Sequence, residues 1–112
     1  MEKDNCLTDE QELEKAIKAK GLTAPRLTPE WIDSVIKGQS FTVLPSGRTM
    51  VCEMELKNGF TVLGVSSCIS KENFNQEIGE KISFTNARDK IWELEGYLLK
   101  QHLHDASKAL KP

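Results

Sequence analysis

The chain has 112 residues, of which 38% are hydrophobic and 29% are charged, and its formal net charge is -2. We expect a single domain over residues 1–112, with flexible ends at 1–7 and 105–112, because this chain can build only one modest core. Positive and negative side chains are interspersed, which argues against nucleic-acid binding. The N-terminus lacks the features of a signal peptide and no apolar run could span a bilayer, so we expect a cytoplasmic protein without a membrane partner.

A first, weakly anchored helix is predicted between Thr8 and Gly21. Thr8 and Gln11 form a capping box, and Gly21 is the residue best able to adopt the left-handed conformation that ends a helix. The inner stripe of this helix is short, and it carries Leu13, Ala16 and Ile17.

A second helix is predicted from Thr28 to Gly38, with Thr28 as N-cap and Pro29 at the first helical position. Its apolar side carries Trp31, Ile32, Val35 and Ile36, and we expect Trp31 to be a core residue.

Between Ser40 and Ile69 the apolar residues alternate with a period of two, which predicts a three-stranded antiparallel meander. An even-length loop sets Val43 opposite Met50. A two-residue turn at Asn58-Gly59 sets Met54 opposite Leu63. The predicted core face therefore carries Phe41, Val43, Met50, Cys52, Met54, Leu56, Leu63 and Val65. Phe60 and Val62 fall on the outer face, where we expect an interface.

A long or broken C-terminal helix, capped by Ser70, is predicted to pack on this sheet. If it continued to His104 it would be roughly 50 Å long at 1.5 Å per residue, far more than three short strands can cover. Ser83 and Asn86 lie in a cluster of poor helix formers, which predicts a bend or break there. The helix either folds back or packs on another chain, and we expect a homo-oligomer with Leu98 and Leu99 in its interface.

Three polar residues of this helix, Arg88, Glu95 and His102, fall inside its apolar arc. These residues have two possible arrangements. They line a seam between packed neighbours, where they are paired or contact a ligand, or a break in the helix near Trp92 shifts the register and exposes them to solvent. Arg88 is the first candidate for a contact, because a guanidinium suits a carboxylate or a phosphate; its structural alternative is an ion pair with Glu95. The predicted binding residues are Arg88, Trp92, Glu95 and Tyr97.

Nothing in the sequence has the spacing of a catalytic or metal site. The three cysteines, Cys6, Cys52 and Cys68, match no zinc or redox motif, and His102 and His104 point to different sides of a helix. We expect no enzyme activity, no metal and no cofactor.

The segment from Asn58 to Leu99 resembles a family of small tailed-phage and prophage proteins to which no activity is assigned. The resemblance lies in Asn58-Gly59-Phe60, Cys68 before Asn73-Phe74, Glu77-Ile78-Gly79, Asn86-Ala87, Lys90-Ile91-Trp92 and Leu94-Glu95-Gly96-Tyr97-Leu98-Leu99. Relatives often have proline directly after the tryptophan, whereas Glu93 here permits a continuous helix. The resemblance implies a phage protein made in the cytoplasm of an infected bacterium, and it implies no reaction.

Two functions are compatible with this sequence. The first is a non-catalytic binding protein that inhibits or redirects a host protein, such as a defence component. The alternative is a homo-oligomer that sequesters a small anionic ligand, such as a signalling nucleotide, between subunits.

Overall fold

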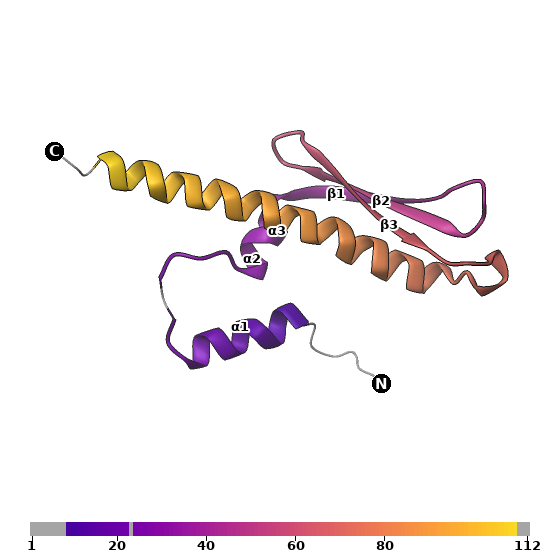
Figure 1. Ribbon diagram of the computed structural model, residues 1–112, viewed down its shortest axis with the longest axis horizontal. Helices are drawn as coiled ribbons and strands as arrows, with labels where there is room; N and C mark the ends of the chain where they lie inside the picture. The colour runs from indigo at the N-terminus through magenta and orange to yellow at the C-terminus, as the bar shows by residue number, and fades with distance from the viewer. Residues whose placement is uncertain (1–8, 23, 110–112) are drawn as a thin grey trace.

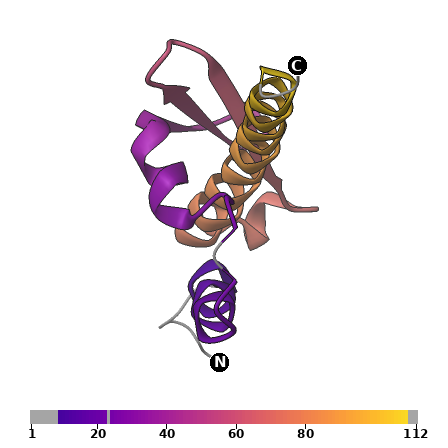
Figure 2. The same cartoon turned by 90° about the vertical axis from the view of Figure 1, so that its left-hand side faces the viewer.

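The computed structural model describes residues 9–22 and 24–109 and has an α+β fold, as predicted. Three strands form an antiparallel sheet of order β1-β2-β3, and the long helix α3 packs along one face of it (Figure 1). Helix α1 lies alongside α3 on the side away from the sheet (Figures 1 and 2). In chain order the elements are α1 (Asp9–Ala19), α2 (Pro29–Val35), β1 (Ile36–Val43), β2 (Thr49–Leu56), β3 (Thr61–Ser67), the 3-10 helix η1 (Lys71–Asn73) and α3 (Gln76–Ala109).

The β1–β2 register agrees with the prediction, because Val43 pairs with Met50 and Phe41 with Cys52. Apolar residues from α2, the sheet and α3 then meet in one core. Its buried members are Ile32, Cys52, Met54, Leu56, Val62, Ala87 and Ile91.

The predicted β2–β3 register is wrong by one residue. The turn has three residues rather than two, since the amide of Leu56 donates to the carbonyl of Phe60 at 2.8 Å and Gly59 has a φ of 93°. A three-residue hairpin loop with glycine in the left-handed region is the usual alternative to a two-residue turn. Because side chains alternate along a strand, the shift exchanges the two faces of β3.

The exchange puts Val62 and Gly64 under α3 and turns Leu63 and Val65 outward. Met54 pairs with Val62 and Cys52 with Gly64. Leu63 and Val65 are 46% and 47% exposed, so they do not belong to the core face that we predicted.

Helix α3 runs unbroken from Gln76 to Ala109, so the long form of the predicted long or broken helix is present and there is no break at residues 83–86. The buried Ser83 hydroxyl donates to the Gly79 carbonyl at 2.8 Å, and the Asn86 side-chain amide donates to the Val65 carbonyl at 2.9 Å. These polar side chains are thus satisfied by the helix itself and by the neighbouring strand.

The start of this helix also differs from the prediction. Ser70 precedes η1, and its side chain makes no capping hydrogen bond. Asn75 takes that role for α3, because its side-chain oxygen accepts from the Ile78 amide at 2.9 Å. A short 3-10 turn therefore separates the end of β3 from the long helix.

The backbone of α3 lies almost directly on β3. A Cβ atom added to Gly64 would stand 2.1 Å from the Ser83 carbonyl oxygen and 2.3 Å from the Ala87 nitrogen. Gly79, Ser83 and Ala87 recur every four residues and face the sheet, so small side chains on both elements permit this approach.

The two N-terminal helices are only partly as predicted. Thr28 caps α2 by accepting from the Trp31 amide at 3.1 Å, and Gly21 has a φ of 68° after α1, as expected. However, α2 ends at Val35 and leads directly into β1, and Trp31 is 51% exposed rather than a core residue. In α1, Leu13 is 63% exposed, and Thr8, the predicted cap, lies outside the described residues.

The distal half of α3, residues 93–109, extends well beyond the sheet (Figure 1). The 34 residues of the helix span about 51 Å at 1.5 Å each, whereas a strand of eight residues spans only about 26 Å. The helix stays regular to Ala109, so the segment after Asp105, which we expected to be flexible, is helical that far; its mobility stays a prediction. No helix in the described part of the chain is both long and apolar enough to cross a membrane.

Replacing Gly64 with alanine should lower the free energy of unfolding by about 3 kcal/mol or more, because overpacking costs about 1–3 kcal/mol even where side chains can move, and here the clash is with helix backbone. Urea denaturation measures the loss. Gly38→Ala is the matched control, since an added Cβ at Gly38 in β1 meets nothing within 4 Å. Equal stability of the two variants would contradict the close packing of α3 on β3.

Candidate functional site

The buried side chain of Arg88 joins all three α-helices. Its side chain is 10% exposed, its Nε donates to Glu10 Oε2 at 2.8 Å, and its Nη1 lies 2.7 Å from Asp33 Oδ1. Nη2 also donates to the Pro29 carbonyl at 3.3 Å. Arg88 therefore lies in a seam between packed helices, which is the first of the two arrangements considered above. Its partners come from α1 and α2 rather than from Glu95.

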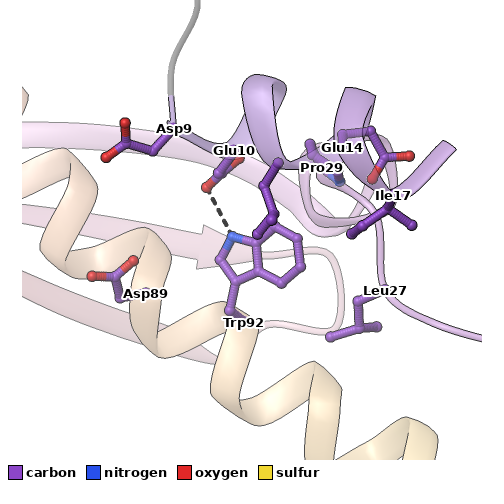
Figure 3. A pocket seen from close by; sticks show the side chains of 9 residues that line it. Asp9, Glu10, Glu14, Ile17, Leu27, Pro29, Asp89 and Trp92 are labelled. Atoms are coloured by element: carbon purple, nitrogen blue, oxygen red, sulfur yellow. Dashed lines mark hydrogen bonds between the residues drawn. The ribbon is translucent and has the colours of Figure 1, made fainter. Parts of the chain in front are cut away.

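Trp92 shares the same carboxylate. Its Nε1 donates to Glu10 Oε2 at 2.8 Å, so one oxygen of Glu10 accepts hydrogen bonds from both Trp92 and Arg88. Figure 3 shows Glu10 reaching from α1 to the indole nitrogen of Trp92 on α3. Arg88 and Trp92 are four residues apart and thus lie on one side of α3. We call their paired Nε and Nε1 atoms the two-donor site.

The pKa of Glu10 reflects these bonds. Partial burial by itself would raise the pKa, but the hydrogen bonds from Arg88 and Trp92 and the charge of Arg88 outweigh it and leave the pKa below the ordinary value of 4.5. Burial likewise works against the charge of Arg88, and its bonds to Glu10 and Asp33 more than compensate, so the pKa of Arg88 is raised. Both groups are ionised at neutral pH.

A pocket of about 330 Å³ remains between α1 and α3 (Figure 3). Its wall combines apolar side chains with four carboxylates, three of which belong to α1. The lining residues are Asp9, Glu10, Leu13, Glu14, Ile17, Leu27, Pro29, Asp89 and Trp92. With α1 in place, such a pocket accepts apolar groups and disfavours an anion.

Helix α1 is attached mainly by polar bonds. Glu14 is its buried residue and forms a bidentate pair with Arg26, at 2.7 and 2.9 Å. The hydrogen bond from Arg26 is the main reason that the pKa of Glu14 is lowered. The partners Glu10, Glu14 and Asp33 were not singled out in the sequence; the one signal for the first two is their spacing of four, which places both carboxylates on one side of α1.

A second groove, of about 450 Å³, lies between α2, the segment before it and the distal half of α3. Trp31 Nε1 donates to Glu95 Oε1 at 2.8 Å across it. The groove gathers three of the predicted residues, Glu95, Leu98 and Leu99, together with His102. Its remaining lining residues are Arg26, Leu27, Thr28 and Trp31.

The other predicted residues are dispersed. Tyr97 is exposed on α3, and Phe60 is exposed next to the hairpin turn. Val62 is buried on the helix side of β3, so its predicted place on the outer face is wrong for the same reason as the register.

The cysteine and histidine side chains of the described residues do not come together in one site. Cys52 is buried in the core and burial raises the pKa of its thiol, while the Cys68 thiol donates to the Ser70 carbonyl at 3.1 Å. His102 and His104 are exposed on the distal half of α3. Among residues 9–22 and 24–109 there is no cluster of three or more histidines, cysteines or acids that could hold a metal ion, and Cys6 lies outside these ranges.

The fold and its grooves describe a small α+β protein whose strongest polar groups hold its own helices together. The chain belongs to the Phage protein (N4 Gp49/phage Sf6 gene 66) family, whose sequence model matches residues 27–103. This confirms the resemblance to a phage family and extends it over α2 and the whole sheet, but not over α1. No curated protein and no solved structure matches the chain.

Replacing Glu10 with glutamine should lower the free energy of unfolding by about 1–2 kcal/mol at pH 7. A hydrogen bond to a charged group contributes roughly 1.5–3 kcal/mol, and solvent reduces this because the Glu10 side chain is partly exposed. Since folding lowers the pKa of Glu10, its stabilisation is complete above pH 4.5 and is lost as the pH falls through the lower, folded-state value. Urea denaturation at a series of pH values should therefore show the gap between Glu10→Gln and wild type closing in acid.

Glu12→Gln is the control, because Glu12 is exposed on the same helix. The assignment of Glu10 fails if both variants behave alike at pH 7, or if the gap of Glu10→Gln persists in strong acid.

Proposed function

We propose that the protein is a non-catalytic binding protein that inhibits or redirects a host protein, such as a defence component, in the cytoplasm of the infected bacterium. The observation that carries this proposal is the apolar surface on the distal half of α3. Leu94, Tyr97, Leu98 and Leu103 are 40%, 74%, 44% and 39% exposed on a helix that the sheet does not cover there.

The arrangement of these side chains supports protein binding. Leu94 and Leu98 are four residues apart, as are Leu99 and Leu103, so they form two adjacent stripes along the helix. Single exposed apolar residues are common on any protein, but two stripes on one extended helix present the kind of surface that docks in an apolar groove of a partner.

The alternative, capture of a small anionic ligand between subunits, has less support. It requires Arg88 to meet a phosphate, yet Arg88 is already paired with two carboxylates, and further acids line the pocket beside it. An incoming anion would have to displace Glu10 or Asp33 and face the remaining negative charge. An enzymatic role has little support too, because the buried Cys52 thiol has a raised pKa and both histidines lie on the distal half of α3.

The immobilised chain should retain a host protein from a lysate of the host bacterium, and the variant Leu94→Ser/Leu98→Ser should retain at least about tenfold less, since fully burying a leucine side chain contributes about 1.5–3 kcal/mol. Mass spectrometry of the bound fraction measures both. Leu63→Ser is the matched control, because Leu63 is 46% exposed on the outer face of β3. Equal retention by all three proteins, or none by wild type, would contradict the proposal.

The state of the free chain is a separate prediction: we expect a homo-oligomer joined through the distal half of α3. Leu98→Ser/Leu99→Ser should then yield a soluble monomer, because it removes apolar area from the interface. Native mass measures the change, and an unchanged mass would rule this interface out. A melt of the same sample with a panel of nucleotides tests the alternative function, which a ligand-dependent rise in melting temperature would favour.

A further inference from the structure

The two-donor site lies within the part of the chain that the family model matches. Arg88 and Trp92 lie on α3 inside the matched residues 27–103, and their N–H groups converge on a single oxygen. A guanidinium N–H and an indole N–H aimed at one point form a receptor for a carboxylate, because neither group can accept a hydrogen bond.

The carboxylate that fills this receptor comes from outside the matched residues. Glu10 lies on α1, which ends at Ala19, before the match begins at Leu27. The family match thus contains the receptor without the element that occupies it in this chain.

Helix α1 also fits its place loosely. Leu13, which lines the pocket, is 63% exposed, and about 330 Å³ stays open between α1 and α3. In the described part of α1 the buried residue is an acid, Glu14, rather than an apolar side chain. Release of α1 therefore exposes little buried apolar area, and its main free-energy cost is the loss of the bonds that Glu10 and Glu14 make.

Charge decides what kind of segment would replace α1. Three of the four carboxylates that line the pocket, Asp9, Glu10 and Glu14, would leave with α1. The uncovered surface would keep Leu27, Pro29, Asp89 and Trp92. Arg88 would stay paired with Asp33 through Nη1, while its Nε and the Trp92 Nε1 would lose their shared carboxylate acceptor.

We propose that α1 occupies, as an internal substitute, a docking site on α3 for an amphipathic helix of the partner protein, and that this helix displaces α1. This inference rests on the proposed binding function and names the site and the partner's chemistry. The partner helix carries an acidic residue in the position of Glu10 and larger apolar residues three and seven positions later, in the positions of Leu13 and Ile17. A segment that fills the pocket better than α1 binds there more tightly and displaces α1.

The test selects a displayed library of helical peptides, of about the length of α1, on the full chain with Trp31→Phe, so that Trp92 is its one tryptophan. We expect enriched peptides to carry Asp or Glu three residues before an apolar residue, and binding to change the fluorescence of Trp92. Replacing that acid with its amide should weaken binding about tenfold or more, since a hydrogen bond to a charged group is lost.

Variants of the chain distinguish peptide binding at the two-donor site from nonspecific binding. Trp92→Phe in the wild-type background removes the indole donor and keeps an aromatic ring, so it should weaken peptide binding, measured with a labelled peptide, by a similar factor. Glu10→Gln should strengthen binding, because the internal competitor is held less tightly. Leu63→Ser should leave peptide binding unchanged, because Leu63 is exposed on β3 and does not line the pocket under α1.

The inference is overturned if enriched peptides lack the acid, if their amide forms bind equally well, or if Glu10→Gln instead produces dimers that exchange α1 between copies. If no peptide is enriched while host-protein retention still depends on Leu94 and Leu98, the inference fails and the proposed function stands. If acidic peptides bind but the wild-type chain retains no host protein, the docking site stands and the proposed function fails.

Discussion

The contact of the α3 backbone with β3 at Gly64 determines the geometry of the rest of the molecule. Because no side chain separates the two elements there, α3 has little freedom to roll or slide on the sheet. With Ala87 against the sheet, Arg88 and Trp92 must project from another side of the helix, where α1 and α2 lie. A glycine in a strand thus fixes the direction of a charged side chain on a neighbouring helix.

Charge, more than apolar packing, then positions the N-terminal helices. A buried guanidinium is costly unless it is paired, and Arg88 obtains its partners from α1 and α2 at once. A buried hydrogen bond to a charged group contributes roughly 1.5–3 kcal/mol, comparable to burying one full apolar side chain, and the bond to the exposed Asp33 contributes less. Since α1 buries no apolar residue in its described part, these bonds and the Glu14–Arg26 pair decide where it lies.

The fold class and the β1–β2 register could be predicted from sequence, whereas the β2–β3 register could not. Asn58-Gly59 fits a two-residue or a three-residue turn, and both registers place apolar residues of β3 on the core face. The correct one also buries Gly64, which gives no hydrophobic signal because its task is to admit a helix from elsewhere in the chain. Ser83 has a poor helix propensity and misled for the same reason, because its close packing on Gly64 of β3 keeps the helix continuous and leaves no local signal.

The candidate site was half visible in the sequence. Arg88 and Trp92 stood out on one helix, but Glu10 lies 78 residues from Arg88, and no local pattern connects an acid in an exposed helix with a distant arginine. The same separation bears on function. The position between Arg88 and Trp92 holds one oxygen, so α1 and any other carboxylate-bearing segment are mutually exclusive there. Binding at that position and release of α1 are therefore two sides of one equilibrium.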